Sequence, residues 1–409
     1  MTVNAQRPSS AAEAADLLTA RLTALEPPPP DEPWRAHSLA EGATGTALLH
    51  IERARAGHGS WPLAHTWVTA AAGSAVSAAD NTGLFLGLPA VAFLLDAAAG
   101  ESGRYRDARA TLDRHLADLA HRRVRTAMDR IRSGRPAIFH EYDTFFGLTG
   151  IGACLLRTDP GGSALEQVLR YLIALTRPLL ISGQRVPGWW VSHDPRRRPH
   201  PAGHANVGAA HGITGPLMLL GQAARHGIAV DGQYEAIAAI CSWLDTWRQD
   251  NGAGPWWPEH LTLEALRTGR PDHPGPGRPG WCYGTPGIAR AGQIAAIALA
   301  EPARQRAYED AFHQCLSDPA QTVRLTGAGL CHGWAGVYQS AWRTAQDATT
   351  TELATRLPSL AEILLRHAIS GTRRVPGFLD GDAGTALALT TAARNAAPIS
   401  GWDACLLIT

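Results

Sequence analysis

The sequence contains no lysine, few charged residues and no long uninterrupted apolar run. All 37 basic residues are arginine, and 36 acidic residues balance them to a formal net charge of +1. Such a near-neutral chain is not expected to bind nucleic acid in general. The longest apolar run, residues 84–95, contains Gly87 and Pro89 and falls well short of the roughly 20 residues that span a bilayer. The N-terminus also lacks the pattern of a secretory signal, so we expect a cytoplasmic protein.

Two common metal-site signatures are missing as well. The sequence has no Cys-x-x-Cys pair, which would close a structural zinc site, and no His-Glu-x-x-His, which would serve a hydrolytic one. It does have six cysteines. In a long chain without a secretory signal these are expected to be free thiols or metal ligands and not a disulfide framework.

Alternating apolar and polar residues, which predict strands, are nearly absent. Residues 163–180 and 233–250 instead carry apolar side chains at three- and four-residue spacing, which predicts helices. The arginine-rich stretch 104–132 has the same period, and a solvated helix face explains it better than a docking surface for an acidic peptide. We therefore predict an all-α protein. Three histidines in a polar, proline-rich stretch are expected to be solvated loop residues: His193, His200 and His204.

A weak internal repeat organises the chain. It is a Gly-x-x-Gly followed by an apolar, helix-forming run, and it occurs seven times, beginning at Gly42, Gly87, Gly147, Gly212, Gly284, Gly333 and Gly381. The second copy is imperfect, because Ala90 replaces its closing glycine. The copies lie roughly 45 to 70 residues apart, which leaves room for one outer and one returning inner helix. Glycine pairs allow close backbone approach, so the inner helices are expected to point their N-termini at a common centre.

Proline-rich segments suggest the domain boundaries. Residues 26–33 form such a segment and are expected to separate a short N-terminal helix from the repeats. We predict two parts: residues 1–33, a helix and proline-rich linker, and residues 34–409, a single domain of helical repeats. A second Gly/Pro-rich loop, residues 268–280, leads directly into Cys282.

Two adjacent repeats carry metal-binding side chains. Trp-Cys282-Tyr precedes the fifth glycine pair, and Cys331-His332 precedes the sixth. If equivalent positions face one centre, these two thiols and one imidazole meet there. That donor set suits one zinc ion and leaves a fourth position open, as catalytic zinc requires. Taken singly, either cysteine is also explained as a small buried hydrophobe, and that is what we expect of the remaining four: Cys154, Cys241, Cys315 and Cys405.

The charge of this donor set narrows the chemistry. Zinc with two thiolates and a neutral histidine is formally neutral, so it lowers the pKa of an incoming thiol while the bound thiolate stays reactive. Hydrolytic zinc sites more often use histidine and carboxylate ligands. The nucleophile is therefore expected to be sulfur and not hydroxide.

Further motifs extend this reading over nearly the whole chain. They are Tyr142-Asp143 before FFGLTGIG, NVGAAHGITG at 206–215, WCYGTPG at 281–287, CHGWAG at 331–336 and Gly401-Trp402-Asp403. Together they resemble the lanthionine synthetase C-like cyclases, zinc enzymes that close thioether rings in lanthipeptides. The resemblance implies an α/α toroid of seven inner and seven outer helices. It also implies one zinc at the end of the central cavity, bound by Cys282, Cys331 and His332.

The resemblance also implies four catalytic residues: His211, Asp143, Tyr283 and Arg278. In such a reaction a cysteine thiolate of the peptide adds to dehydroalanine or dehydrobutyrine and forms an enolate. Arg278 and Tyr283 are candidates to stabilise the enolate oxygen. His211 is the candidate proton donor, and Asp143 would orient its imidazole or hold it charged. Structural alternatives stand beside these roles: a hydrogen-bonding histidine, an aspartate capping a helix, and a tyrosine that orients its neighbouring cysteine.

The function predicted from the resemblance is that of a stand-alone class I lanthipeptide cyclase. Its substrate would be a precursor peptide, leader plus core, dehydrated by a separate enzyme, because the chain has no kinase-like or dehydratase region. An exporter complex would be a further partner and would bring the cyclase to the membrane. A monomer is expected. Some relatives carry a β-containing insert, thought to hold the leader, where residues 104–132 are predicted to be helical, so the leader-docking site is not predicted.

Three other functions fit parts of the pattern. A relative could add glutathione or another small thiol to dehydroamino acids. A peptide-binding scaffold could hold the zinc with four protein ligands and no chemistry. An all-α zinc prenyltransferase shares thiol activation but not these motifs.

Overall fold

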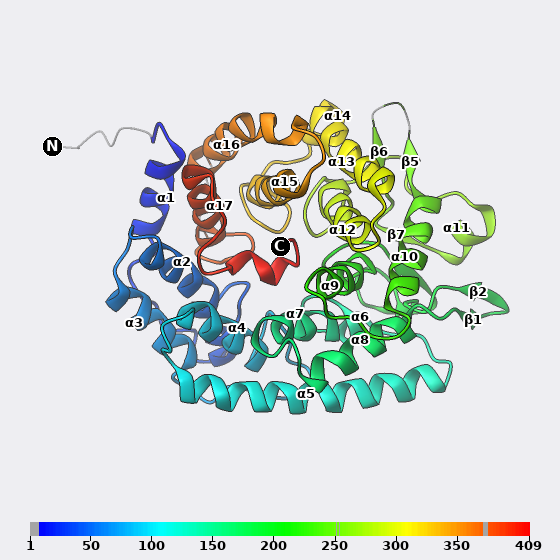
Figure 1. Ribbon diagram of the computed structural model, residues 1–409, viewed down its shortest axis with the longest axis horizontal. Helices are drawn as coiled ribbons and strands as arrows, with labels where there is room; N and C mark the ends of the chain where they lie inside the picture. Colours follow the sequence, from blue (N-terminus) through cyan, green and yellow to red (C-terminus); the bar gives the residue numbers. More distant parts are fainter. Residues whose placement is uncertain (1–7, 251, 253, 371–374) are drawn as a thin grey trace.

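The helices form two concentric rings (Figure 1). The structure, a computed structural model, describes residues 8–250, 252, 254–370 and 375–409. Seven described helices form the inner ring: α2 (Ala43–Arg55), α4 (Leu88–Ala99), α7 (Leu148–Thr158), α9 (Thr214–Arg225), α12 (Thr285–Ala298), α15 (Trp334–Asp347) and α17 (Asp382–Arg394). Seven more surround them: α1 (Ala11–Ala20), α3 (Trp61–Ala72), α5 (Arg106–Arg132), α8 (Ser163–Leu175), α10 (Gln233–Trp247), α13 (Pro302–Ser317) and α16 (Glu352–Ser370). The predicted all-α toroid is confirmed.

The two rings follow from two burial patterns in the sequence. Inner helices are buried on nearly every side; in α4 every residue except Asp96 is buried. Outer helices bury a single stripe. In α5 the buried residues recur at three- and four-residue intervals, which confirms the predicted helix over 104–132. The helix α1 packs against α17 and thereby completes the outer ring, next to the last inner helix of the chain.

A closed circle of backbone hydrogen bonds joins the seven loops that precede the inner helices. Each loop donates at least one N–H to a carbonyl of the next. In ring order the bonds are Leu39 to Phe85 (3.1 Å), Phe85 to Phe145 (3.1 Å), Thr144 to Ala210 (3.1 Å), Ala210 to Cys282 (3.3 Å), Cys282 to Cys331 (3.1 Å), Cys331 to Leu379 (2.9 Å) and Leu379 to Ala40 (3.1 Å). The residues that flank the glycine pairs therefore lie together at one end of the ring.

The closing glycines of the repeat are explained by close backbone contact. A Cβ on Gly287 would lie 2.1 Å from the carbonyl oxygen of Trp281, and one on Gly336 would lie 1.9 Å from that of Leu330. Both carbonyls belong to the residue six positions earlier, in the loop that turns into the helix. Only glycine allows this approach.

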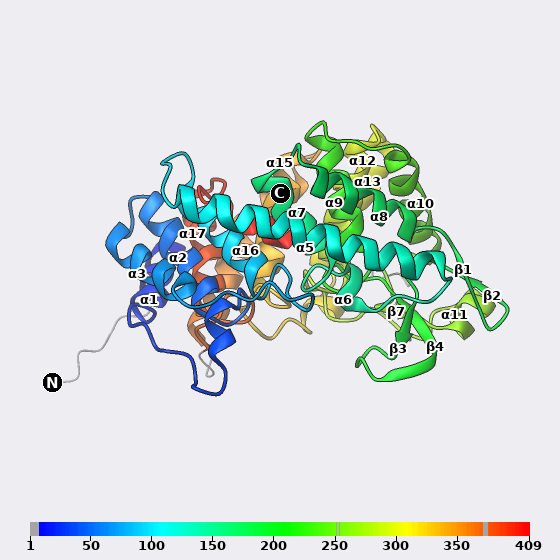
Figure 2. The same ribbon diagram turned by 90° about the horizontal axis from the view of Figure 1, so that it is seen from below.

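Short strands lie outside the two rings, where the sequence predicted almost none. The described residues contain β1 (Leu179–Ile181), β2 (Gln184–Val186), β3 (Val191–His193), β4 (Pro199–Asn206), β5 (Gln249–Asp250), β6 (Pro255–Trp256) and β7 (His260–Leu261). The strands β3, β4 and β7 form one antiparallel sheet in that order, which projects beyond the helices in Figure 2. Short helices complete the described fold: η1 (Pro33–His37), α6 (Phe139–Tyr142), α11 (Leu263–Thr268), α14 (Pro319–Thr322) and η2 (Trp402–Leu406).

The expectation of solvated histidines in this region is wrong for two of the three. His193 and His204 are buried, with relative exposures of 8% and 1%, while His200 is exposed. The reason is pairing between distant segments, because β4 pairs with β3 on one side and with β7 on the other. The aromatic ring of Phe139 packs edge-on against both buried imidazoles.

The C-terminal segment fills the middle of the inner ring (Figure 1). Polar side chains of several inner helices hold it. The Glu52 carboxylate of α2 accepts from the Ser400 N–H at 2.8 Å, and Arg343 of α15 pairs with the buried Asp403 at 2.7 and 2.8 Å. Closer to the loop circle, the indole N–H of Trp281 donates to the Leu406 carbonyl at 2.9 Å. The segment therefore supports the loops from within. None of the described helices combines the length and apolarity needed to cross a membrane.

Candidate active site

Three metal-binding side chains meet at the loop circle. One ligand atom each of Cys282, Cys331 and His332 lies within 4.8 Å of the others, and no other such group of three occurs in the described part of the chain. The loops before α12 and α15 bring them together, since the Cys282 N–H donates to the Cys331 carbonyl at 3.1 Å. Cys282 is 8% exposed. Two sulfurs and one imidazole nitrogen at this spacing fit a zinc ion, which prefers such donors.

The electrostatics of this cluster favour one thiolate. A hydrogen bond from the Cys331 thiol lowers the pKa of Cys282, against the opposing effect of burial, and His332 adds to the lowering. The same hydrogen bond raises the pKa of Cys331, whose proton it holds. The pKa of His332 is raised by its hydrogen bond to Cys282 and by the charge of Asp380. A negative sulfur at Cys282 is what a cationic metal requires.

Asp380 was not predicted from the sequence, and the structure places it beside the cluster. Its Oδ1 lies 3.5 Å from Nδ1 of His332. A signal for it was present: Asp380 directly precedes the first glycine of the seventh repeat, as Tyr283 and His332 do in the fifth and sixth, and His211 in the fourth. In the loop circle this register position faces the same end of the ring.

The structure also brings His211 and Asp143 together. Nδ1 of His211 lies 2.7 Å from Oδ2 of Asp143, a carboxylate with no exposed side-chain surface. The other carboxylate oxygen accepts from the backbone N–H groups of Phe146 and Gly147 at 2.7 and 2.8 Å. Asp143 thus bonds the backbone before α7 as a capping residue would, while it also fixes the imidazole. The carbonyl of Ala210, next to His211, accepts from the third loop, so this pair is part of the circle.

Tyr283 lies between the histidine and the metal-binding cluster. Its phenol oxygen accepts from the Asn206 side-chain amide at 3.0 Å. Burial raises the pKa of the phenol, so it keeps its proton and remains a hydrogen-bond donor. Asn206 was not predicted as a site residue, although it belongs to the motif that carries His211. It is 1% exposed and stands at the end of β4.

The structure gives Arg278 a looser place than its predicted role requires. The side chain is exposed, and no hydrogen bond or ion pair holds it within the described part of the chain. Its positive charge does act on the cluster: burial raises the pKa of Asp380 and the hydrogen bond to Cys282 raises the pKa of His332, and Arg278 opposes both rises. Arg278 is therefore an electrostatic neighbour of the candidate metal site in this conformation.

A second arginine, absent from the predictions, contacts the histidine directly. Nη2 of Arg197 lies 3.2 Å from Nε2 of His211. Arg197 stands at the turn between β3 and β4. No sequence signal pointed to it, because the contact depends on a hairpin that the apolar pattern did not predict.

The remaining cysteines take no part in the site. All six are free. The four outside the cluster are buried, as expected, and burial raises the pKa of Cys241 and of Cys315 to about 12. Their thiols are protonated and inert at neutral pH.

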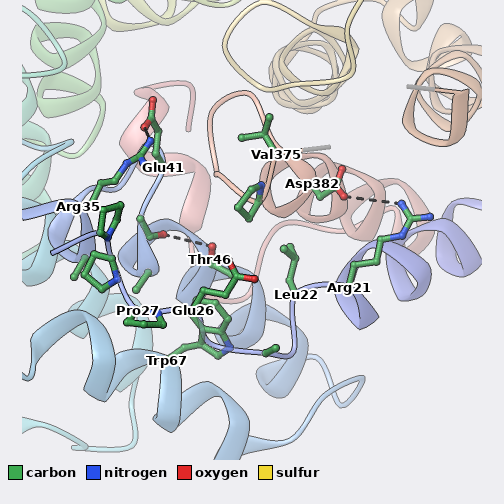
Figure 3. Close-up of a pocket in the computed structure, with 17 residues that line it drawn as sticks. Arg21, Leu22, Glu26, Pro27, Arg35, Glu41, Thr46, Trp67, Val375 and Asp382 are labelled. Carbon is green, nitrogen blue, oxygen red and sulfur yellow. Dashed lines mark hydrogen bonds and ion pairs between the residues drawn. The ribbon is translucent and has the colours of Figure 1, made fainter. Parts of the chain in front are cut away.

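A pocket lies at the first and seventh loops. It has a volume of about 450 Å³ and is lined by residues of α1, the proline-rich segment after it, and the loops before α2 and α17. Figure 3 shows Arg21 and Asp382 facing each other at one side of it, and these two side chains lie 3.9 Å apart. No residue of the metal-binding cluster or of the His211 pair lines it. The candidate site is thus a separate feature of the same molecule.

Comparison with known proteins supports the fold and a family. The family model described as "Lanthionine synthetase C-like protein" matches residues 33–407. Among solved structures, one described as "Nisin cyclase" superposes with a TM-score of 0.79 and 17% sequence identity, and the alignment covers 97% of this chain and 97% of that chain. At this identity the likeness shows the fold alone. No curated protein matches.

Proposed function

The chain belongs to the lanthionine synthetase C-like family, and on this premise we propose that it is a lanthipeptide cyclase. The reaction is the addition of a cysteine thiol of a dehydrated precursor peptide to a dehydroalanine or dehydrobutyrine of the same peptide. The observation that carries the proposal is the placement of the Cys282, Cys331 and His332 donors and the His211–Asp143 pair on successive loops of one circle. A thiol-activating group and a proton carrier are what this addition needs.

The donor set fits one zinc ion, with Cys282, Cys331 and His332 as its protein ligands. When bound there, zinc supplies the lowered thiol pKa that makes the peptide cysteine a nucleophile at neutral pH. The loops themselves hold the two cysteines in register through the Cys282–Cys331 backbone bond. Asp380 faces the imidazole of His332 and would keep its other nitrogen turned to the metal.

His211 is the proposed carrier of the proton. The thiol loses a proton as its sulfur attacks, and the α-carbon must gain one after the new carbon–sulfur bond has formed. A neutral imidazole that bonds Asp143 through Nδ1 offers the lone pair of Nε2 for the first step. The imidazolium then returns the proton, and Asp143, buried and fixed by two backbone N–H groups, stabilises the charge in between. No oxidant or further reactant is needed.

Negative charge builds on the substrate carbonyl oxygen during the addition. Tyr283 is a proposed donor to that oxygen, because its phenol is neutral and accepts from Asn206, which leaves its own O–H free to donate. Arg278 is proposed as a more distant cation whose positive charge stabilises the negative charge that develops on the substrate. We expect its side chain to approach the substrate only in the complex.

The proposed partners follow from the reaction. The dehydrated precursor, leader plus core, must come from a separate dehydratase, and an exporter complex would receive the product. We propose a cytoplasmic monomer that reaches the membrane only through such a complex. We also propose that residues 34–409 form a single cyclase domain and that residues 1–33 comprise a helix and a proline-rich linker, with that helix, α1, packed on α17 of the domain.

The test is to incubate the zinc-loaded protein with a dehydrated precursor and to follow free thiols by alkylation and mass spectrometry. Ring formation consumes the free thiol without changing the mass of the peptide. It therefore predicts that the peptide is no longer alkylated and that its mass before alkylation is unchanged. Unchanged alkylation, with a partner dehydratase shown to be active, would contradict the proposal. Addition of glutathione to the peptide in place of ring closure would instead identify a small-thiol transferase.

A further inference from the structure

The hairpin β3–β4 places an arginine directly over the candidate proton carrier. Its tip is a tight turn in which the Asp194 N–H donates to the Arg198 carbonyl at 2.8 Å and the Asp194 carboxylate accepts from the Arg198 N–H at 2.8 Å. Arg197 stands in this turn with φ +65°, a left-handed conformation that side chains other than glycine rarely adopt. The turn directs its guanidinium to His211, 14 residues further along the chain.

The contact defines the state of the imidazole. A guanidinium has donors only, so at 3.2 Å Nε2 of His211 must accept, and the ring proton must sit on Nδ1, where it is donated to Asp143. The lone pair that the proposed reaction uses is therefore covered by Arg197 in this conformation. Once Nε2 gains a proton, two cationic donors face each other, and the guanidinium has to leave.

Arg197 has no competing anionic partner. No carboxylate within the described ranges forms an ion pair with it, and its side chain is exposed at the mouth of the site. Three other charged or titratable groups lie near this pair. Tyr142 donates its phenol hydrogen to the His211 carbonyl at 3.1 Å, Arg123 interacts with Asp143 through its charge, and the pKa of His140 is lowered chiefly by burial and in part by the charges of Arg197, Arg123 and His211. Arg196 and Arg198 flank Arg197 at the tip and are exposed too, but neither side chain contacts the histidine. Arg197 is thus a cation at Nε2 of His211 that no carboxylate of the described residues neutralises.

Nε2 of His211 and the substrate oxygen that becomes negatively charged must lie close together during the reaction. The α-carbon that takes the proton and the carbonyl oxygen that carries the enolate charge are separated by one carbon, about 2.4 Å. A guanidinium that reaches Nε2 of His211 can therefore reach the oxygen of a substrate whose α-carbon stands at Nε2. It would do so at the moment when protonation of His211 displaces it.

We propose that Arg197 is a catalytic residue that covers Nε2 of His211 in the free enzyme and binds the substrate carbonyl oxygen while this oxygen carries the enolate charge. The inference rests on the proposed function and adds to it a residue outside the repeat motifs. When His211 takes the proton of the thiol, Arg197 leaves Nε2 and moves to the substrate oxygen, so the two events are coupled. The balance is unchanged: the proton moves from the thiol to His211 and on to the α-carbon, and Arg197 only donates hydrogen bonds.

Steady-state ring formation by the zinc-loaded full chain tests this role, with neighbouring arginines as controls. We expect Arg197→Met to lower kcat by about 100- to 1,000-fold with little change in KM, as loss of an oxyanion donor does. Arg197→Lys keeps the charge without the planar fork and should retain an intermediate rate. Arg196→Met and Arg198→Met should stay within about twofold of the wild type. Equal increases in KM for all three methionine variants would show a docking surface for an acidic peptide segment and would overturn the proposal.

A second measurement, independent of activity, tests the contact itself. The Nε2 resonance of His211 in histidine labelled with nitrogen-15, assigned by its loss in His211→Phe, should shift in Arg197→Met and not in Arg196→Met. An unshifted resonance in Arg197→Met would overturn the inference. If the resonance shifts but the wild type closes no rings on a dehydrated precursor, then the proposed cyclase function fails and the catalytic role of Arg197 fails with it, while the contact stands.

Discussion

At the scale of single residues, the position directly before the first glycine of each repeat recurs as a functional one. His211, Tyr283, His332 and Asp380 occupy it in four successive repeats, and Cys282 and Cys331 stand one place earlier. The circle of backbone bonds turns this register into proximity. Residues 48 or more positions apart in sequence thus meet in the same site.

We predict that metal binding and turnover separate between two variants. Cys331→Ala should lose zinc and ring formation together, because it removes a ligand. His211→Phe should keep about one zinc per chain and lose turnover by at least about 100-fold, since it removes only the proton carrier. Metal analysis beside the alkylation assay measures both, and His200→Phe, an exposed histidine, is the control. Ring formation retained in the His211 variant would assign the proton transfer to another group.

Asp380 gives a second residue-scale prediction. Asp380→Asn should weaken zinc binding by about tenfold, because the carboxylate facing Nδ1 orients His332 and strengthens it as a ligand. Competition with a chelator measures the change. Glu41→Gln is the matched control, since Glu41 acts on Asp380 through its charge alone. Equal losses of zinc affinity in the two variants would show that Asp380 acts only through its negative charge and does not orient His332.

The sequence predicted the metal-binding cluster because its positions follow the repeat, and the family resemblance implied His211 and Asp143. The structure places the members of each group together. Their roles stay predictions. Arg197 was not predictable in this way, because its contact depends on the turn of a hairpin with no apolar period. For Arg278 the opposite holds. The family motif predicted a catalytic role for it, but its side chain makes no direct contact with the cluster in the described structure.

At the scale of elements, the helices were predictable and the β3–β4–β7 sheet was not. The α5 helix carries its buried stripe in its own sequence. The strand β4 has a polar sequence, and its burial depends on β7, which lies more than fifty residues further along the chain. Local periodicity cannot report such pairing.

Two histidines of this sheet, His204 and His260, are expected to make the stability of the protein depend on pH in the acid range. Burial lowers the pKa of His204 and of His260 from 6.5 to about 4. Between pH 6.5 and 4 the unfolded chain therefore binds more protons than the folded one, and the free energy of unfolding falls as the pH falls. His204→Phe should reduce this slope by about 1 kcal/mol per pH unit in urea unfolding, whereas the exposed His200→Phe should leave it unchanged. Equal slopes in the wild type and both variants would contradict the prediction.

At the scale of the whole molecule, the two ends of the chain complete the toroid. The α1 helix packs on α17 and completes the outer ring, and the C-terminal segment occupies the centre. The repeat number and the helical architecture could be predicted from the glycine pairs. The filling of the centre could not, because it depends on single polar contacts between segments far apart in sequence.

Asp403 tests the importance of that filling. It is fully buried and accepts from Arg343 and from Gln339. Asp403→Ala would leave the guanidinium without its partner, so we expect the free energy of unfolding to fall by about 3 to 5 kcal/mol. Urea unfolding measures this, with the exposed Asp231→Ala as control. A loss below about 1 kcal/mol would show that the segment does not stabilise the ring.

The central claim is that Cys282, Cys331 and His332 hold one zinc with a position open to a peptide thiol. X-ray absorption at the zinc edge tests it most directly, with and without a dehydrated precursor. We predict two sulfur ligands in the free protein and a third sulfur when the precursor is added. Four protein ligands that do not change on addition of the precursor would contradict the account.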